Sequence, residues 1–358
     1  MTTTQLPRVD RTLPKEEALA EIQSIKAELG DQLLILGHHY QVDDVIRFAD
    51  LVGDSFKLAQ LAAKNTVAKT IMFCGVHFMA ESADILANEG QVVVLPDMAA
   101  GCSMADMANV DQTETAFEEL DQGNLIPLTY MNSSAAIKAF VGRKGGSVCT
   151  SSNAMTVIRW ALKQKERLLF LPDQHLGRNV CFELGIPLSD MAIWDPHALP
   201  EVNMANGCDR AKILLWKGHC SVHTKFLPPH VDQVRAQYPG IQVIVHPECP
   251  IEVVRKADQW GSTEKIIRVV TESPEGSVWA IGTEINLVSR LAQKNPGKTI
   301  VSLSGINCLC STMYRVDPHS MLWVMRNLRE GRVVNRIKVD AETAHWARVA
   351  LDRMLSMA

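Results

Sequence analysis

The sequence predicts an α/β fold of three pseudo-equivalent three-layer αβα domains, whose small parallel sheets surround a central cavity, with helices at the C-terminus. Two observations support this prediction. Short apolar runs alternate with helical stretches along the chain, which is typical of parallel sheets built from βαβ units. Polar residues at the ends of these runs recur at matching intervals, which indicates an internal repeat.

The composition is that of a globular protein. Hydrophobic residues make up 47% and charged residues 21% of the 358 residues, and the formal net charge is -4. These values exclude a disordered chain, and the lack of a basic stripe argues against nucleic acid or a membrane surface as partner. No apolar run approaches the about 18 residues of a membrane helix, and segment 1–11 lacks the pattern of a signal peptide. We therefore expect a cytoplasmic protein.

The first predicted element is a helix. Pro14 suits its first position and Gly30 ends it, because glycine is favoured just past the end of a helix. Apolar residues between them recur at helical spacing on one face, namely Leu19, Ile22, Ile25 and Leu29.

The predicted strands are ten short apolar runs that each lead into a polar or glycine-containing corner. Helical stretches separate them, so the strands are expected to pair in parallel. The runs are 33–36, 70–73, 92–95, 125–128, 147–149, 168–171, 213–216, 241–245, 278–281 and 300–303.

The interval between strand-end residues repeats in the first and third parts of the chain. His38 and Cys102 are 64 positions apart, and so are His246 and Cys310. A shared interval with similar corner chemistry indicates blocks of common design. A second interval, of 17 positions, joins His38 to Ser55 and His246 to Thr263.

The middle block is longer, with 90 positions between Tyr130 and Cys220. The surplus falls in the proline-rich and polar stretch 187–208, which we interpret as a surface insertion, a loop without a catalytic part. The predicted division is an N-terminal segment 1–19, αβα domains 20–112 (with Cys102), 113–228 (with Cys220) and 229–318 (with Cys310), and C-terminal helices 319–358.

Two helices are predicted after Pro318. The second should begin at Asp340, because aspartate is a favoured N-cap residue. Its apolar face should consist of Ala347, Ala350, Leu351 and Met354.

The nine cysteines are either buried apolar thiols or a site assembled from distant parts of the chain. In a reducing compartment disulfides are not expected, and no CxxC pair indicates a zinc ribbon. The repeat places Cys102, Cys220 and Cys310 at strand ends, one in each block. Three thiolates suit an iron–sulfur cluster with one open iron better than structural zinc, which usually has four ligands. Cys308 is an alternative to Cys310, whereas Cys74, Cys149, Cys181 and Cys249 are interpreted as buried thiols.

Hydroxyl-bearing corners precede three predicted helices: Asp54-Ser55, Thr150-Ser151-Ser152 and Ser262-Thr263. Each can cap its helix, and that role alone would explain it. A helix N-terminus also attracts anions, so three of them at one cavity could bind a small dicarboxylate or tricarboxylate. A further set of strand-end residues offers acid–base groups, namely His38, Tyr40, Tyr130, Asn132, His246 and Glu248.

Taken together, these motifs resemble the quinolinate synthase family over residues 20–357. The resemblance is carried by several segments, each weak alone and specific in combination. They are Gly37-His38-His39-Tyr40, Gly53-Asp54-Ser55, Phe78-Met79, 130–139, 150–153, 172–178, His246-Pro247-Glu248 and Gly261-Ser262-Thr263.

The resemblance implies a transferase that condenses iminosuccinate with dihydroxyacetone phosphate to quinolinate, with loss of water and phosphate, in NAD biosynthesis. It implies one [4Fe-4S] cluster per chain on Cys102, Cys220 and Cys310, with one iron open to substrate. Transient contact with the enzyme that produces iminosuccinate is also expected. Tyr40, Glu248 and His38 are the implied acid–base residues. The implied substrate-binding residues are His38, Ser55, Tyr130, Met131, Asn132, Ser151, His246, Pro247, Glu248 and Thr263.

Two other functions fit the same cysteines. One is a different cluster-dependent hydro-lyase acting on a small dicarboxylate. The other is an iron–sulfur redox sensor, which would need a helix-turn-helix or a basic patch for its partner, and neither is present in the sequence.

Overall fold

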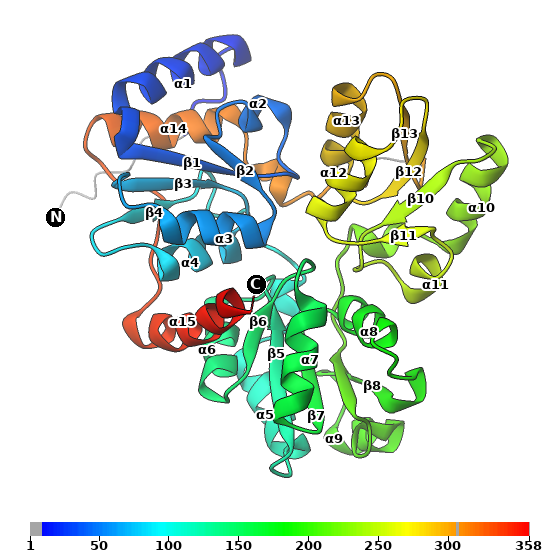
Figure 1. The fold of residues 1–358 in the computed structure, drawn as a ribbon. Helices are drawn as coiled ribbons and strands as arrows, with labels where there is room; N and C mark the ends of the chain where they lie inside the picture. The colour runs from blue at the N-terminus through cyan, green and yellow to red at the C-terminus, as the bar shows by residue number, and fades with distance from the viewer. Residues whose placement is uncertain (1–8, 306–307, 358) are drawn as a thin grey trace. The chain divides into compact units, whose positions relative to one another are not determined.

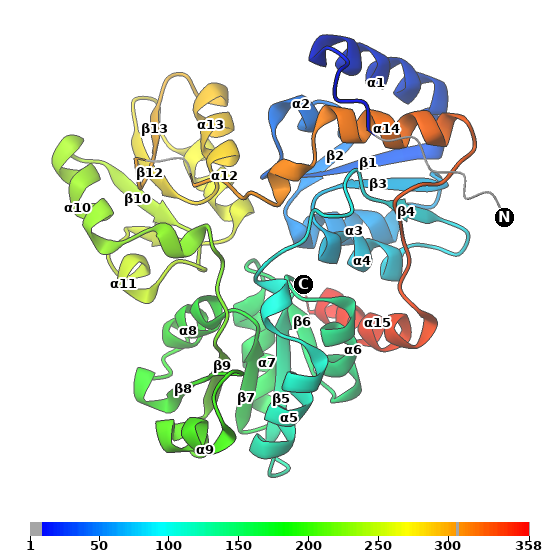
Figure 2. The same ribbon diagram turned by 180° about the vertical axis from the view of Figure 1, so that it is seen from behind.

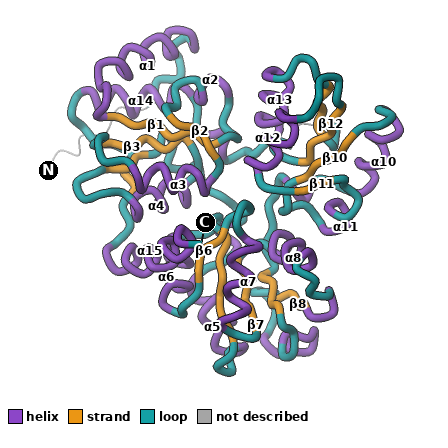
Figure 3. The backbone as a smooth tube through the Cα atoms, in the orientation of Figure 1, coloured by secondary structure: helices purple, strands orange, loops and turns teal. Residues whose placement is uncertain are grey.

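The computed structural model describes residues 9–305 and 308–357 and confirms the predicted α/β architecture (Figure 1). Its strands gather in three sheets, each flanked by helices (Figure 3). The chain divides into two compact units. Unit 1 comprises the chain as far as Gly53, then Lys57–Gly101 and Ser311–Lys338, and unit 2 comprises Asp54–Phe56, Cys102–Cys310 and the chain from Val339 onward. The five-part division expected from the sequence stays a prediction.

The sheet of unit 1 has the strand order β14-β4-β3-β1-β2. The predicted strands β1, β3 and β4 pair in parallel, the unpredicted β2 pairs in parallel with β1, and β14 joins the edge antiparallel to β4. The elements are α1 (Lys15–Leu29), β1 (Leu33–His38), α2 (Asp43–Ile46), β2 (Leu51–Gly53), α3 (Ser55–Lys64), β3 (Thr70–Cys74), α4 (His77–Leu86), β4 (Val92–Val94), α14 (Pro318–Arg329) and β14 (Arg336–Ile337).

Helices α1 and α14 lie together on one face of this sheet, and α3 and α4 lie on the other (Figure 1). The predicted apolar face of α1 is confirmed, because Ile22 and Ile25 are fully buried in one cluster with Ile35 of β1 and Met325 of α14. Pro14 is the N-cap of α1 and not its first helical residue, as had been expected.

The second sheet belongs to unit 2 and is parallel throughout, with the order β6-β5-β7-β9-β8. Helix α7 covers one face (Figure 1), and α5 covers the other, seen from behind in Figure 2. The elements are α5 (Val110–Leu120), β5 (Leu125–Tyr130), α6 (Ala135–Arg143), β6 (Ser147–Cys149), α7 (Ala154–Gln164), β7 (Arg167–Leu171), α8 (Gln174–Glu183), β8 (Met191–Trp194), α9 (Pro200–Asn203) and β9 (Ile213–Trp216).

The stretch 187–208 is not the plain surface loop expected from the sequence. It contributes β8, which pairs with β9 at the edge of the second sheet, then α9 and a π-helical turn, Met204–Cys208. Ala192 and Trp194 are buried while Ile193 is partly exposed, which is the alternation of a strand covered on one face only. A strand this short has a weak sequence signal, because its partner strand stabilises it more than its own composition does.

Arg167 ties the start of β7 to three neighbouring segments. Its buried guanidinium donates to the carbonyl of Ala211 at 3.0 Å, to that of Leu120 at 2.9 Å and to that of Cys208 at 2.6 Å. The planar fork of arginine suits several acceptors at once, and a lysine ammonium could not reproduce this geometry.

Replacing Arg167 by methionine should lower the free energy of unfolding by about 3 kcal/mol or more. Three buried carbonyls would lose a charged donor, and each such loss costs about 1–3 kcal/mol. Urea unfolding followed by circular dichroism would measure the change. The matched control is Arg159→Met on the exposed side of α7, expected to stay within about 0.5 kcal/mol. Equal effects of the two substitutions would contradict the assigned role of Arg167.

The third sheet also belongs to unit 2, with the parallel order β11-β10-β12-β13. Its core includes Val243, Val245 and Ala280, together with Cys249 and Cys308. The elements are α10 (Pro228–Gln237), β10 (Gln242–Val245), α11 (Ile251–Val254), β11 (Gln259–Trp260), α12 (Thr263–Glu272), β12 (Val278–Gly282), α13 (Ile285–Lys294) and β13 (Thr299–Ser302).

The last helix, α15 (Ala341–Ser356), packs against α6 and β6 in unit 2. The predicted N-cap is confirmed, since the Asp340 side chain accepts a hydrogen bond from the Thr343 N–H at 3.0 Å. Gly142 allows the close approach of α6, because a Cβ at this position would lie 2.0 Å from the carbonyl oxygen of Trp346. The four residues of the predicted apolar face are all fully buried: Ala347, Ala350, Leu351 and Met354.

Among the described residues, no helix combines the length and the apolar character needed to cross a membrane.

Candidate active site

The candidate active site lies at the carboxyl end of β10, where parallel sheets usually bind ligands. The chain turns there through His246, Pro247 and Glu248, and the Cys249 N–H closes the turn on the His246 carbonyl at 3.0 Å. His246 and Glu248 are both buried. A buried carboxylate is costly unless it is paired, so its partners indicate what the site can do.

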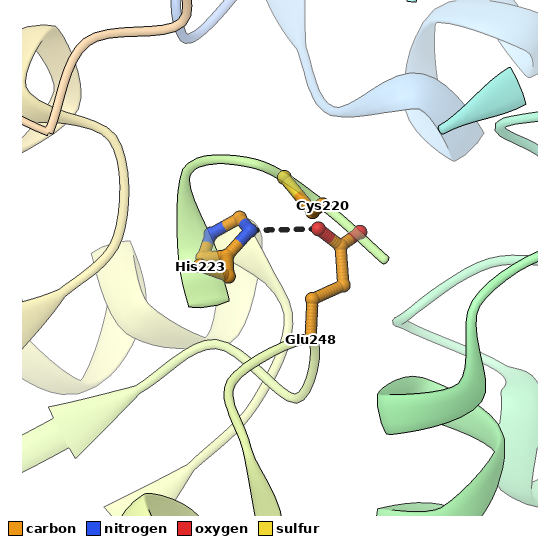
Figure 4. Close-up of side chains that lie close together, drawn as sticks. All are labelled: Cys220, His223 and Glu248. Atoms are coloured by element: carbon orange, nitrogen blue, oxygen red, sulfur yellow. Dashed lines mark ion pairs between the residues drawn. The ribbon is translucent and has the colours of Figure 1, made fainter. Parts of the chain in front are cut away.

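Glu248 is paired with two histidines and a tyrosine. Its Oε2 lies 2.7 Å from Nδ1 of His223 (Figure 4) and 3.9 Å from Nδ1 of His246. The hydroxyl of Tyr130, at the end of β5, donates a hydrogen bond to the same carboxyl group. Strand ends of two sheets therefore meet at one carboxylate, as the sequence predicted for Tyr130, His246 and Glu248.

His223 is held from both sides. It lies on the 3-10 turn His223–Lys225, and its Nε2 is 3.1 Å from the Thr283 hydroxyl while its Nδ1 faces Glu248. The imidazole of His246 stacks on that of His223, with ring centroids 4.5 Å apart. His223 and Thr283 were not predicted as site residues from the sequence. The available signal was the spacing Cys220-x-x-His223, which places both side chains on one turn.

The pKa values of Glu248 and His246 are both shifted below their ordinary values. Burial alone would raise the pKa of Glu248, but the charge of His223 and the hydrogen bonds from His223 and Tyr130 hold it below its ordinary value. Burial lowers the pKa of His246 to about 3, which leaves that imidazole neutral at physiological pH. The site thus contains an ionised carboxylate beside a neutral imidazole, and both side chains are in a form that can accept a proton or a hydrogen bond.

The thiol of Cys220 joins this cluster. Its sulfur, a nitrogen of His223 and a carboxylate oxygen of Glu248 all lie within 4.8 Å of one another (Figure 4). Burial is the main cause that raises the pKa of the Cys220 thiol well above its ordinary value, and the charges of Glu248 and Cys102 add to it. Burial likewise raises the pKa of Cys102 to about 12, with Cys310 and Glu248 among its charged neighbours.

Exposure divides the nine cysteines into two groups. Cys102, Cys220 and Cys310 keep part of their surface accessible, whereas the other six are buried. Cys308 is fully buried in the core of the third sheet and lies 3.3 Å from the Ser304 hydroxyl. The Cys310 N–H donates to Oε1 of Glu284 at 3.5 Å, and burial raises the pKa of that carboxyl to about 7. These positions favour Cys310 over Cys308 as a metal ligand.

Met131 and Asn132 follow Tyr130 in the turn after β5. The Met131 N–H donates to the Cys149 carbonyl at 2.7 Å, which anchors this turn to the neighbouring strand. The buried Oδ1 of Asn132 has no hydrogen-bond partner in the part of the chain that the structure describes. Such an acceptor is expected to receive a bond from a ligand or from water.

The hydroxyl corners have different local roles. Ser262 caps α12 as predicted and accepts from the Lys265 N–H at 3.3 Å, which places Thr263 in the first turn of that helix. The expectation that the Thr150–Ser152 corner caps α7 is wrong, because Asn153 is the N-cap residue and accepts from Thr150 through its side chain.

The structure brings two of the hydroxyl corners together. Ser151, Ser152 and Ser262 line one pocket of about 680 Å³. Ser55 is the first residue of α3, and its neighbour Asp54 accepts a hydrogen bond from the Ser152 hydroxyl at 3.0 Å. Binding of a carboxylate by these corners stays a prediction.

His38 and Tyr40 lie together in unit 1, where His38 is the last residue of β1 and Tyr40 follows in the turn. Their ring centroids are 4.7 Å apart, and the Tyr40 N–H donates to Nδ1 of His38 at 3.1 Å. His38 is buried. Their roles in substrate binding and acid–base chemistry stay predictions.

The fold and the site define a class of protein: an α/β enzyme with an ionised carboxylate, imidazoles and a thiol at the carboxyl ends of parallel strands. Residues 20–356 match the family model described as quinolinate synthetase A protein. The chain belongs to this family.

Curated relatives agree along almost the whole chain. The quinolinate synthase of Acidobacterium capsulatum is 56% identical over 97% of this chain and 94% of its own length. Those of Anoxybacillus flavithermus and Herpetosiphon aurantiacus are 52% and 53% identical, over 99% and 96% of this chain and 97% and 93% of their own lengths. The predicted family and the predicted quinolinate synthase function are therefore confirmed.

Proposed function

We propose that this protein condenses iminosuccinate with dihydroxyacetone phosphate to give quinolinate, water and phosphate in NAD biosynthesis. The observation that carries this proposal is the similarity to quinolinate synthases over 97% of the chain at 56% identity. The buried Glu248, His223 and Tyr130 cluster supports it, because a condensation with loss of water requires protons to be taken up and delivered at defined atoms.

We infer that Cys102, Cys220 and Cys310 hold a [4Fe-4S] cluster. The donor set fits: these are the three cysteines with accessible surface, and electrostatic interactions link Cys102 to Cys310 and Cys220 to Cys102. The raised pKa values of Cys102 and Cys220 fit as well, since such thiols are neutral alone and are deprotonated when a metal coordinates them. When bound, a cluster with three thiolate ligands would supply one open iron as a Lewis acid.

The protein's own groups would bind substrate and move protons. The ionised Glu248 can accept a proton from a substrate carbon or nitrogen through its carboxylate, while the Tyr130 hydroxyl and His223 stabilise the charge. The neutral His246 and the unpaired Oδ1 of Asn132 can orient an imino or hydroxyl group. Helix α12, capped by Ser262, offers N–H groups to a carboxylate.

Anaerobic purification followed by iron and sulfide analysis and a quinolinate assay tests the proposal. We expect about four irons per chain, as a [4Fe-4S] cluster requires, and quinolinate formation from the two substrates. A folded protein with stoichiometric zinc and no quinolinate would contradict it. A cluster-loaded protein that dehydrates a hydroxy dicarboxylate but makes no quinolinate would indicate the alternative hydro-lyase.

A further inference from the structure

The sequence motif 172–178 leads into helix α8 (Gln174–Glu183), and neither the cluster nor the acid–base residues give it a role. Its neighbours in the fold are the two segments that form the candidate active site. One is the turn that bears Glu248, and the other is the strand end that leads to Cys220 and His223. The contacts of α8 with each of them are specific.

The first contact is made by Asn179, a buried residue in the middle of α8. Its Nδ2 donates one hydrogen bond to the Pro247 carbonyl and another to the Cys249 carbonyl, both at 2.8 Å. These two carbonyls flank Glu248 on either side. Both donors of one side-chain amide are therefore used on the turn that sets the direction of the Glu248 side chain.

The second contact is made at the start of α8. Asp173 caps the helix, and its Oδ1 accepts from the His175 N–H at 2.7 Å and the Leu176 N–H at 3.1 Å. The Gln174 N–H donates to the Gly218 carbonyl at 3.0 Å. Gly218 lies two positions before Cys220, so the helix that holds the Glu248 turn also holds the approach to Cys220 and His223.

The contact between Glu248 and His223 therefore joins two segments that α8 fixes separately. The carboxylate oxygen and the imidazole nitrogen are only 2.7 Å apart, and their electrostatic attraction falls as the distance between them grows. Without the Asn179 amide, the peptides on either side of Glu248 would need other donors. These two peptide groups could then rotate and move the Glu248 carboxylate away from His223 and Tyr130.

We propose that Asn179 is a positioning residue for quinolinate synthesis, which holds the Glu248 carboxylate against His223 and Tyr130 through the backbone of residues 247 and 249. The inference rests on the proposed function and assigns a role to helix α8. The two hydrogen bonds of the Asn179 Nδ2 both go to the backbone on either side of Glu248, so the effect of the amide should pass through Glu248.

The test compares Asn179→Leu with Asn203→Leu in the cluster-loaded enzyme. Asn203 is a matched control, because it is equally buried and bonds both the N–H and the carbonyl of Asp195 at 2.9 Å, next to the edge strand β8 of the second sheet. Asn179→Leu should lower kcat by about 10-fold to 100-fold with KM changed less than about 3-fold, as for other outer residues that orient site groups. Asn203→Leu should keep kcat within about 2-fold of the wild-type value. It should lower Tm by about as much as Asn179→Leu does.

Two further measurements separate positioning from general destabilisation. In a Glu248→Gln background, Asn179→Leu should cost less than about 2-fold in kcat, because residues that act through one another are not additive. Iron per chain should stay the same in all variants. If Asn179→Leu does not fold, Asn179→Asp keeps the side-chain size, places an oxygen against the two carbonyls, and should show the same loss of kcat.

The proposal is overturned if the Asn179 variants keep the wild-type kcat. It is also overturned if the loss is equally large in the Glu248→Gln background, or if Asn203→Leu loses as much activity at the same iron content. A wild-type enzyme that holds its cluster but makes no quinolinate would instead overturn the proposed function, so the two failures are distinguishable.

Discussion

Cys310→Ala should remove the iron–sulfur cluster, whereas Cys308→Ala, two positions away, should keep it. The physical reason is the environment of the two thiols: Cys308 is fully buried in the core of the third sheet, and Cys310 keeps accessible surface and neighbours Cys102. With Cys310→Ala, iron should fall from about four per chain to below about one. Activity should fall by about 1,000-fold or more, because Lewis-acid stabilisation worth several kcal/mol is lost.

Cys308→Ala tests the contribution of this thiol to packing in the core of the third sheet. It deletes a buried sulfur from a packed core, so the free energy of unfolding should drop by about 1 kcal/mol while iron and kcat persist. Iron and sulfide are measured on protein purified without oxygen, next to the quinolinate assay. Loss of iron from Cys308→Ala with retention in Cys310→Ala would reverse the assignment of the third ligand.

Glu248→Gln should reduce kcat by about 100-fold to 10,000-fold, the range typical for removal of a group that transfers protons. Glutamine keeps the size of the side chain and can still accept a bond from His223 or Tyr130, so the fold and the cluster should survive. What is lost is the charge that allows Glu248 to accept a proton, a charge favoured by its contacts with His223 and Tyr130.

The control for this substitution is Asp121→Asn. The Asp121 carboxylate accepts from the Gly123 N–H at 2.8 Å and the Leu125 N–H at 3.2 Å, at the opposite end of β5 from Tyr130. Asp121→Asn should change the free energy of unfolding only modestly and leave kcat within about 2-fold of the wild-type value. Steady-state kinetics at matched iron content measures both variants. If Glu248→Gln kept most of its kcat, Glu248 would not be the proton-transferring group.

Much of the fold could be predicted because its strands are short apolar runs buried on both faces, such as β7, whose composition alone favours a strand. The strands that were missed, β2, β8, β11 and β14, have two to four residues each. Their pairing depends on a partner elsewhere in the chain. Residues 336–337 form a strand only because β4 presents a free edge to them, which no local pattern reveals.

That Tyr130, His246 and Glu248 lie together could be expected because all three follow apolar runs that form parallel strands, while their roles in substrate binding and catalysis stay predictions. His223 was missed because it lies on a short 3-10 turn, His223–Lys225, whose local sequence resembles that of other polar turns in the chain. Asn179 was missed because its role depends on carbonyls nearly 70 positions away, and backbone acceptors leave no trace in side-chain patterns.

The division of the cysteines by exposure has a consequence for how the metal-free protein would behave toward alkylating reagents. Only the thiolate form of cysteine reacts readily, and burial keeps Cys102 and Cys220 in the thiol form at neutral pH. A reagent could reach these two sulfurs and still modify them slowly. Accessibility and nucleophilicity are therefore uncoupled at these two cysteines, and the desolvation that protects the thiols from electrophiles is also a cost that a metal would have to overcome to bind them as thiolates.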